Sequence, residues 1–395
     1  MSDRLDWLAE ALDPLRRQGL IRRRRRVKPL TDGYCKIDGR RLWNFASNDY
    51  LNLAHDPRVI ETARSAAQIA GVGATASPLV SGRTDWHARL EQRLAEFEGQ
   101  EAAVLFPSGY AANLGTISAL VGRGDVVFCD RLNHASLVDG CRLSGAKLRV
   151  YRHNRLEKLR CELEKWAGPR RRLIVTDSLF SMDALAAPLP QLCRLAERYD
   201  AVLLIDEAHA TGIFGNHGRG LAELMAVEDQ VSVRVGTLSK AIGSMGGFVT
   251  GSRDLIDWLW NRAQTQMFST ALPPAVCAAA CKSIEIIMQE PDRRERLLSR
   301  AESFRLRLRD CEFSTPADGI GPIVPIILNE PGSAVMAADE LEQQGFLVAS
   351  IRPPTVPRGT SRLRITLSCA HHDEDVQRLA DILVRVLPRT TTALT

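Results

Sequence analysis

The sequence predicts an α/β protein with a large, mostly parallel sheet domain and a smaller C-terminal α+β domain. Short apolar runs alternate with amphipathic helical stretches between about residues 100 and 250, which is the pattern of parallel strands joined by helices. After residue 275 the pattern changes to long helical stretches separated by a few strands. The length of 395 residues also exceeds that of one average domain. We therefore expect an N-terminal helical and extended segment over residues 1–50, a large domain over 51–275 and a small domain over 276–395.

A helix is expected just before the sheet region. Apolar side chains repeat at helical spacing from Trp86 to Phe97, between the cap residue Thr84 and the stop signal Gly99. In the large domain we expect strands at Ala103–Phe106, Val126–Cys129, Leu173–Thr176, Val202–Ile205, Val231–Val235 and Gly247–Gly251. In the small domain we expect strands at Ile323–Leu328, Leu347–Ile351 and Leu363–Leu367, a helix that ends near Gln344, and a final helix.

The composition is that of an ordinary soluble globular protein, with 45% hydrophobic and 25% charged residues. No apolar run is long enough to cross a bilayer, and the first residues lack the pattern of a secretory signal, so we expect a cytoplasmic protein. Nine cysteines without a CxxC pair argue against a disulfide framework or a zinc finger. Cys277 and Cys281 are four residues apart, but no His or carboxylate accompanies them, so we expect buried thiols and no metal site.

The net charge of +5 is modest, and much of it lies in the run Arg22–Arg26. Such a run fits a nucleic-acid surface, a pocket for a phosphate or carboxylate substrate, or a solvated helical face. No aromatic-rich strand or recognition helix accompanies the arginines. We therefore expect small-molecule substrates, and neither nucleic acid nor a membrane as partner.

The segment Thr237–Lys240 follows a predicted strand and precedes the glycine-rich stretch Gly243–Gly247. A lysine held at a strand end among small residues can form a Schiff base with an aldehyde cofactor. The neighbouring hydroxyls and backbone amides can bind a phosphate. An isolated Ser-Lys pair would be an ordinary loop lysine, so this interpretation depends on the other strand ends.

Asp206 and His209 follow the preceding predicted strand. A carboxylate at that place can pair with the protonated pyridine nitrogen of pyridoxal phosphate, and His209 can reach the phenolic oxygen of the same cofactor or the substrate. Nucleotide-binding and metal-binding α/β proteins also place an Asp after a strand. The combination of Asp206 with Lys240 on consecutive strand ends is more specific than either residue alone.

Three further predicted strands end in polar or small residues. Pro107–Asn113 runs into an expected helix, whose N-terminal amides can bind a phosphate. His134 can stack on a cofactor ring and donate to a substrate carbonyl, and Ser181 can hydrogen-bond the cofactor. Each residue could instead belong to a helix cap, the core or a turn. Because the carboxyl ends of parallel strands meet at one edge of a sheet, the five clusters together predict a ligand site there.

The same stretches are typical of one enzyme family. Over nearly its whole length the chain resembles the α-oxoamine synthase family of fold-type I pyridoxal-phosphate enzymes. This resemblance implies an aspartate aminotransferase-like fold and pyridoxal 5'-phosphate as cofactor. The stretches that carry it are Asn48–Leu51, Leu79–Gly82, Asn133–Leu137, Phe180–Asp183, Asp206–His209 and Thr237–Lys240.

The resemblance implies roles for individual residues. Lys240 would be the Schiff-base lysine that also moves the α-proton, Asp206 the partner of the pyridinium nitrogen, and His134 the stacking residue that also assists the substrate. The implied cofactor contacts are Gly109, Tyr110, His134, Ser181, Asp206, His209, Thr237 and Lys240, together with Ser269 or Thr270 from the partner subunit of a homodimer with interfacial active sites. The implied substrate contacts are Arg22, His134 and Thr355, with Asn48 and Arg352 near the amino-acid carboxylate.

The segments Ile351–Pro357 and Gly359–Arg364 most resemble the branch of the family that serves biotin synthesis. This branch implies the decarboxylative condensation of L-alanine with a pimeloyl thioester of coenzyme A or of an acyl carrier protein. The chain departs from the family pattern at Ala210 and over Gly73–Pro78, so sibling reactions of glycine or serine with another acyl-CoA stay open. A nucleotide-binding or nucleic-acid-binding protein without the cofactor is the alternative of another class, although no GxGxxG follows the first predicted strand.

Overall fold

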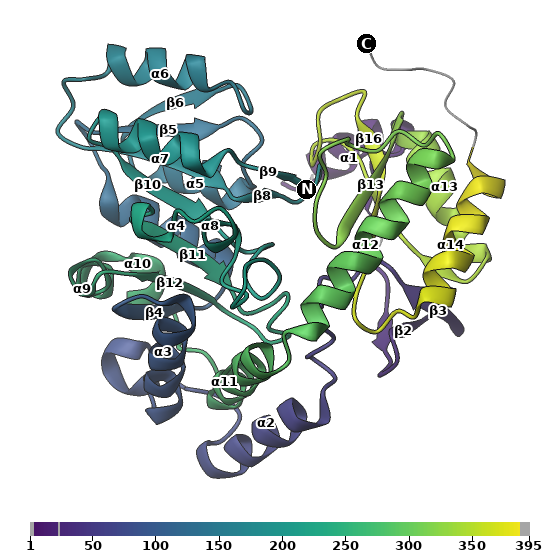
Figure 1. Ribbon diagram of the computed structural model, residues 1–395, viewed down its shortest axis with the longest axis horizontal. Helices are drawn as coiled ribbons and strands as arrows, with labels where there is room; N and C mark the ends of the chain where they lie inside the picture. The colour runs from purple at the N-terminus through teal and green to yellow at the C-terminus, as the bar shows by residue number, and fades with distance from the viewer. Residues whose placement is uncertain (1–3, 23, 388–395) are drawn as a thin grey trace. The chain divides into compact units, whose positions relative to one another are not determined.

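The computed structural model describes residues 4–22 and 24–387 of the chain (Figure 1). Its contacts divide these residues into two compact units, which are described separately below. The larger unit consists of Asn48–Ser181 and Leu185–Arg296. The smaller unit consists of the described residues up to Ser47, of Met182–Ala184 and of the described residues from Leu297 onward.

A seven-stranded sheet forms the centre of the larger unit. Its strands are β4 (Ala102–Phe106), β5 (Val126–Asp130), β6 (Lys147–Tyr151), β7 (Arg172–Asp177), β10 (Val202–Asp206), β11 (Val233–Thr237) and β12 (Gly247–Gly251). They lie in the order β4-β12-β11-β10-β7-β5-β6, and only β12 runs antiparallel to its neighbours. Figure 1 shows this succession from β4 to β6. The predicted α/β fold with a mostly parallel sheet is confirmed.

Two details of the sheet differ from the prediction. Strand β11 begins at Val233 instead of Val231, because a 3-10 turn at Glu228–Gln230 still includes Val231 as its C-terminal cap. Strand β6 was not predicted at all. It is an edge strand whose residues are mostly exposed or half-buried, so its sequence lacks the continuous apolar run of the central strands.

Helices and short turns connect the strands of the larger unit. The predicted helix before the sheet is confirmed as α3, which begins after the cap Thr84 and ends at Gly99 in the left-handed conformation. The helices are α2 (Pro57–Ala70), α3 (Asp85–Glu98), α4 (Gly109–Leu120), α5 (Ala135–Leu143), α6 (Leu156–Lys165), α7 (Leu189–Arg198), α8 (Leu221–Leu224), α9 (Arg253–Arg262), α10 (Gln264–Met267) and α11 (Pro274–Gln289). A π-helical turn η1 (Pro78–Gly82) and a hairpin of β8 (Leu179–Phe180) and β9 (Leu185–Ala186) complete the unit.

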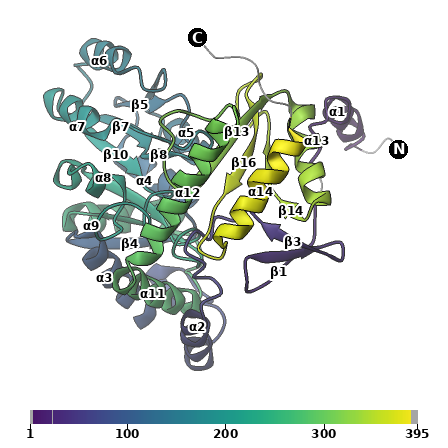
Figure 2. The same ribbon diagram turned by 45° about the vertical axis from the view of Figure 1, so that its right-hand side comes forward.

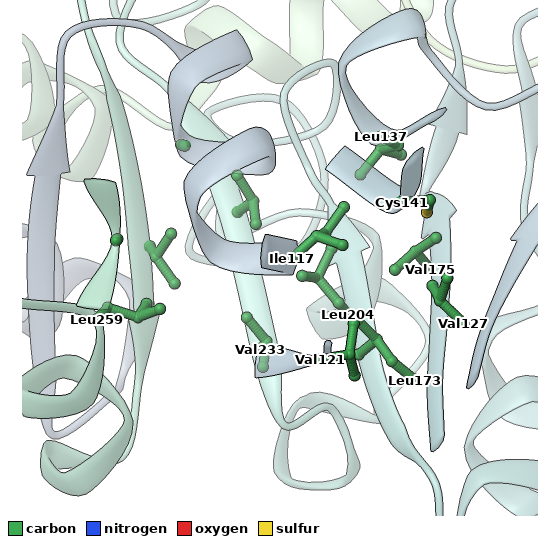
Figure 3. Packing of buried hydrophobic residues seen from close by; sticks show 14 of the residues in the cluster. Ile117, Val121, Val127, Leu137, Cys141, Leu173, Val175, Leu204, Val233 and Leu259 are labelled. Carbon is green, nitrogen blue, oxygen red and sulfur yellow. The ribbon is translucent and has the colours of Figure 1, made fainter. Parts of the chain in front are cut away.

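Buried apolar side chains cover the sheet on both faces. On one face Ile117 of α4 and Leu137 of α5 pack against strand residues such as Val127 and Leu204 (Figure 3). The strand residues that point the other way, among them Leu203, are also fully buried, and α7 contacts β10. Burial on both faces explains why the central strands are continuous apolar runs and why polar residues stand out at their ends.

The smaller unit contains two sheets that draw on both ends of the chain (Figure 2). One consists of β13 (Ile323–Asn329), β16 (Ser361–Thr366) and β15 (Ala349–Ile351), all antiparallel. The other consists of β1 (Val27–Pro29), β2 (Tyr34–Ile37), β3 (Arg40–Asn44) and β14 (Phe346–Leu347). The helices with residues in this unit are α1 (Trp7–Arg17), α12 (Asp292–Asp310), α13 (Pro331–Gln343) and α14 (Asp373–Val386).

The prediction of one strand over Leu347–Ile351 is wrong. The chain leaves β14 after Leu347, passes the buried residue Val348, and enters β15 at Ala349, which belongs to the other sheet. A five-residue apolar run cannot show that its two halves pair with different partners. Within the described part of the chain, no helix has both the length and the apolar character that a membrane span requires.

Candidate functional site

The carboxyl ends of β7, β10 and β11 bring polar residues together in the larger unit. Asp206 is the last residue of β10 and pairs in register with Asp177, the last residue of β7. On its other side Asp206 pairs with Val235 of β11, two residues before the strand ends at Thr237. Asp206 and the Thr237–Lys240 turn therefore lie at one edge of the sheet, as the strand pattern predicts, and Asp177 adds a second carboxyl group there.

Lys240 lies in a turn that is held by its own backbone. The Leu238 N–H donates to the carbonyl oxygen of Gly246 at 3.0 Å, and the Ser244 N–H donates to that of Leu238 at 2.8 Å. A Cβ at Gly243 would lie 2.4 Å from the backbone nitrogen of Ala54, so only glycine fits this close approach. The rigid turn sets the Lys240 Nζ atom 2.9 Å from Nε2 of His209.

Asp206 is only 6% exposed and accepts two hydrogen bonds. Asn113 of α4 donates from Nδ2 to its Oδ2 atom at 2.6 Å, and the Ala208 N–H donates to its Oδ1 atom at 2.8 Å. Both donors are neutral, so neither cancels the charge of the carboxylate. A buried carboxylate with neutral partners is suited to a cationic N–H group such as a pyridinium.

His134 caps the N-terminus of α5 and is linked to Asp206 through two side chains. Asn113 also donates to Ser136 Oγ at 2.9 Å, and Ser136 Oγ lies 2.8 Å from Nδ1 of His134. The Ser136 N–H donates to the same Nδ1 atom at 3.3 Å, which leaves the ring proton on Nε2. The residue is exposed, yet the protein around the ring withdraws it from water enough to lower the pKa of His134. His134 is therefore a neutral donor at neutral pH.

Two residues of this network were missed in the sequence. Asp177 accepts the His134 backbone N–H at 2.7 Å, and its burial and the charge of Asp206 raise its pKa well above the usual range. Asn113 belongs to the predicted phosphate-binding stretch, but its bonds to Asp206 and Ser136 were not foreseen. The only sequence signal for Asp177 is its place at the end of an apolar strand.

The N-terminus of α4 forms a cradle for an anion. Ser108 caps this helix of 12 residues and accepts from the Ala111 N–H at 3.1 Å, while the amides of the first turn remain directed out of the helix end. A Cβ at Gly109 would lie 3.3 Å from both Cβ and Oγ1 of Thr237. This close packing favours glycine at position 109 and brings the Thr237 side chain next to the first turn of α4, whose amides can bind a phosphate group.

Tyr110 borders the same helix end. It is 44% exposed, its hydroxyl donates to Asp139, and its ring meets that of His134 edge to face with 6.4 Å between the centroids. The amine of Lys240, the buried carboxylate of Asp206 and the anion cradle thus occupy one edge of the sheet. These three groups fit pyridoxal 5'-phosphate, which carries an aldehyde, a basic ring nitrogen and a phosphate.

The remaining predicted residues of the larger unit are arranged as follows. His209 follows β10 and lies 2.6 Å through Nδ1 from the hydroxyl of Tyr50. Asn48 lies two residues before Tyr50, and its Oδ1 atom is 3.4 Å from the same hydroxyl. Ser181 is half-buried directly after β8. Thr270 is exposed and lines a small cavity with residues that include Phe106 and Pro107.

The other predicted substrate residues lie together in the smaller unit. Arg22 donates from Nη2 to Thr355 Oγ1 at 3.4 Å, and Arg352 donates from Nη2 to the carbonyl oxygen of Ile21 at 3.0 Å. Arg25 differs from its neighbours because it forms a bidentate pair with Glu342, at 2.6 and 2.8 Å. Arg23 lies outside the described residues. The arginine run is therefore divided between an internal ion pair and a cluster with the loop at 352–355.

Comparison with known proteins gives one family. Residues 40–383 match the family model of class I and II aminotransferases. The chain is 47% identical over 390 residues to the 8-amino-7-oxononanoate synthase of Anaeromyxobacter dehalogenans strain 2CP-1, covering 97% of this chain and 96% of the relative. It is 47% identical over 382 residues to the protein of the same name from Methylococcus capsulatus, covering 96% and 98%.

Solved structures show the same relationship. The serine palmitoyltransferase of S. paucimobilis with a bound PLP–myriocin aldimine superimposes with a TM-score of 0.92, at 31% identity and 97% coverage of both chains. The 8-amino-7-oxononanoate synthase of Francisella tularensis superimposes with a TM-score of 0.75, at 28% identity, covering 87% of this chain and 97% of that one. The serine palmitoyltransferase structure therefore contains the same cofactor that fits the site of this chain.

Proposed function

The chain belongs to the class I and II aminotransferase family and, within it, to the α-oxoamine synthases, and from this premise we propose that it condenses L-alanine with a pimeloyl thioester. The products are 8-amino-7-oxononanoate, carbon dioxide and the free thiol. The single observation that carries the proposal is the grouping of Lys240, Asp206 and the helix-end cradle at one sheet edge. The relatives at 47% identity supply the choice of reaction.

Pyridoxal 5'-phosphate is the cofactor, and when bound it supplies an aldehyde for covalent attachment of an amine and a ring that withdraws electrons from the α-carbon. Lys240 provides the amine. The Gly109 and Tyr110 amides with the Thr237 hydroxyl bind the phosphate. Asp206 would accept a hydrogen bond from the ring nitrogen, which would favour the protonated form of that nitrogen.

The side chains around the amine position the reaction. Lys240 removes the α-proton of L-alanine and later returns a proton, for which its amine must be unprotonated at the first step. A carbon–carbon bond then forms between the alanine α-carbon and the acyl carbon, and the thiolate leaves. Loss of the former carboxyl group as carbon dioxide follows. His134, a neutral donor through Nε2, would hold the new carbonyl oxygen. His209 would reach the phenolic oxygen of the cofactor, and Ser181 would hydrogen-bond the cofactor.

The substrate contacts follow from the same resemblance. Asn48 and Arg352 bind the carboxylate of alanine, for which the planar guanidinium of arginine is suited. Arg22 and Thr355, which already contact one another, bind the acyl thioester. The thiol carrier is coenzyme A or an acyl carrier protein. Because none of the nine cysteines is in a disulfide, we place the reaction in the reducing cytoplasm.

We also propose a homodimer in which Thr270, or its neighbour Ser269, reaches the cofactor phosphate bound by the partner subunit. Thr270 is exposed and follows a patch of exposed apolar side chains on η1 and after α10. In this patch Val80 is 81% exposed and Phe268 is 74% exposed. A contiguous apolar surface beside a binding site is typical of a subunit contact.

The experiment that tests the reaction is reconstitution of the purified protein with pyridoxal phosphate, followed by visible absorption and thiol release. We expect a visible band that L-alanine perturbs, and thiol release that requires both L-alanine and pimeloyl-CoA. Lys240→Ala should remove the band and the turnover. Lys282→Ala is the matched control, because Lys282 lies on α11 in an ion pair with Glu285.

The same assay separates the alternatives. If glycine or L-serine with acetyl-, succinyl- or palmitoyl-CoA releases thiol faster than L-alanine with pimeloyl-CoA, the chain carries out a sibling reaction. If the wild-type protein remains colourless after reconstitution, it does not bind pyridoxal phosphate. The alternative of a nucleotide-binding protein would then stand. Mass spectrometry of the product identifies the ketone in each case.

A further inference from the structure

A row of hydrogen bonds runs from the segment before α2 to the amine of Lys240. The Tyr50 hydroxyl lies 2.6 Å from His209 Nδ1, and His209 Nε2 lies 2.9 Å from Lys240 Nζ. Tyr50 has no exposed surface, and His209 is 8% exposed. A short, buried row of this kind fixes where its protons lie, because no water competes for them. The family resemblance gave a role to His209 and Lys240 but none to Tyr50.

The distances indicate the direction in which Tyr50 donates. Its hydroxyl lies 3.4 Å from Asn48 Oδ1 and 2.6 Å from His209 Nδ1. An O–H donor prefers the acceptor at 2.5–3.0 Å, so the phenolic proton is directed to the imidazole. A neutral imidazole that accepts at Nδ1 carries its own proton on Nε2.

This tautomer has a consequence for Lys240. The Nε2–H group of His209 is aimed at Nζ, so Nζ must accept, which only the unprotonated amine can do. If Nζ were an ammonium group, both Nζ and His209 Nε2 would carry hydrogens, and neither atom could accept a hydrogen bond from the other. We propose that Tyr50 is a positioning residue that holds the His209 proton on Nε2 and thereby favours the unprotonated amine of Lys240. The inference rests on the proposed function in so far as Lys240 is the amine that captures the cofactor.

The neighbouring charges make such a device useful. Lys240 interacts electrostatically with His134 and Asp177, and Asp206 interacts with the same two groups. A carboxylate such as Asp206 near an amine favours the ammonium form, which cannot attack an aldehyde. Asp177 contributes less to this effect, because burial keeps its pKa well above the usual range. The Tyr50–His209 pair opposes Asp206 without adding a charge of its own.

The same tautomer also serves the bound state. The resemblance makes His209 a cofactor contact, and its place after β10 lets it reach the phenolic oxygen, for which an Nε2–H group is a suitable donor. Tyr50 would therefore hold one ring orientation for both partners of His209, first the free amine and then the cofactor. The Tyr50 and His209 rings are tilted by 50° with 6.2 Å between the centroids, so they meet through the hydroxyl and Nδ1 and do not stack.

The first test needs no variant and no cofactor. The protein is labelled with ¹⁵N-histidine, freed of pyridoxal phosphate, and examined by NMR between pH 6 and 9. The His209 signals are identified by their loss in His209→Asn. We expect Nε2 to be protonated and Nδ1 unprotonated at neutral pH. A wild-type His209 with its proton on Nδ1, or with both nitrogens protonated at pH 8, would overturn the proposal.

The second test removes the phenolic hydroxyl. Tyr50→Phe retains the buried ring, and Tyr151→Phe is the matched control because Tyr151 is also buried and hydrogen-bonds Thr176, away from Lys240. The measured quantity is the rate at which each protein develops its visible band with added pyridoxal phosphate, as a function of pH. We expect Tyr50→Phe to move the rise of this rate to higher pH and to slow it by up to about tenfold at pH 7, which corresponds to one net hydrogen bond.

The outcomes separate this proposal from the proposed function. If the wild type never develops the band, the function fails, while the NMR result still decides the tautomer. If the band develops equally fast in Tyr50→Phe and in the wild type at every pH, the role of Tyr50 is wrong and the function stands. Thermal unfolding of the cofactor-free variants shows whether each is folded. Should Tyr50→Phe unfold, the wild-type NMR measurement alone decides the proposal.

Discussion

Asp206 and Asp177 are neighbouring buried carboxyl groups that have different roles in the site. Both carboxyl groups are buried at the ends of neighbouring strands, and two negative charges so close are unfavourable. The raised pKa of Asp177 relieves this repulsion by keeping its proton. Asp206 is the carboxylate that we propose as the partner of the cofactor's ring nitrogen. Asp177 instead orders His134 by accepting its backbone N–H.

The pH dependence of the reaction should report His134. Its pKa lies below the ordinary value of 6.5, so the ring stays neutral until the pH falls below 6.5 and is protonated only there. We therefore expect the acid side of the kcat/KM profile to fall below pH 6.5 and not above it. In His134→Gln we expect the decrease of kcat/KM that is due to protonation of this residue to disappear. The plateau value of kcat/KM should be lower by a factor of about 10²–10⁴. An acid limb centred above pH 7, or one unchanged in His134→Gln, would contradict this role.

At the scale of elements, the cradle depends on how closely β12 approaches the start of α4. A Cβ at Gly247 would lie 2.4 Å from the Ser108 carbonyl oxygen and 2.6 Å from the Gly109 backbone nitrogen. Backbone atoms cannot move aside as a side chain end can. The antiparallel strand β12 therefore sets the position of the helix end to which we assign the cofactor phosphate.

We expect Gly247→Ala to displace this helix end. The protein should lose about 1–3 kcal/mol of unfolding free energy, as in other overpacked sites, and should release pyridoxal phosphate at least about tenfold faster. The measurements are thermal or urea unfolding and the decay of the visible band after dilution. Gly122→Ala is the control, because Gly122 follows α4 and its added Cβ would meet only the Ser144 carbonyl oxygen at 3.8 Å. Equal cofactor release from both variants would show that β12 does not set the cradle.

The elements also show what the sequence could and could not predict. The central strands and α3 were predictable, because burial on both faces and clear caps leave strong local patterns. The edge strand β6 and the division between β14 and β15 were not, since exposure and a change of sheet leave no such pattern. In the site, the lysine and the carboxylate were found from strand ends and resemblance. Asp177, Asn113 and Tyr50 were missed, because their roles arise from strand order and from contacts between distant segments. The limits of the three predicted domains and the roles of the site residues stay predictions.

At the scale of the whole molecule, the proposed dimer can be tested by mixing subunits. Lys240→Ala and Thr270→Glu should each be inactive alone if Thr270 serves the partner's site. In a randomly mixed dimer of the two, one of the two sites is intact, so an equal mixture should regain about a quarter of the wild-type activity. Thiol release measured after dissociation and reassociation checks this.

The control for subunit mixing is a pair of changes that belong to the same side of the site. Lys240→Ala mixed with Asp206→Asn should regain no activity, because every site then keeps one defect. Recovery in this control, or no recovery with Thr270→Glu, would contradict a site shared between subunits.

The parallel pairing of β14 with β3 has a consequence for how the chain is made. Phe346 lies opposite Trp43. The ribosome therefore completes β3 about 300 residues before it synthesises β14, the strand that pairs with β3. At about 5–20 residues per second this delay lasts roughly 15–60 s, during which the segment Asn48–Arg296 can already collapse around its own core. The waiting hairpin would expose an open strand edge to other nascent chains. Its exposed side chains include Lys36, Arg40 and Arg41, and such charges discourage edge-to-edge association. We therefore expect these positive charges to reduce association between nascent chains before β14 is synthesised.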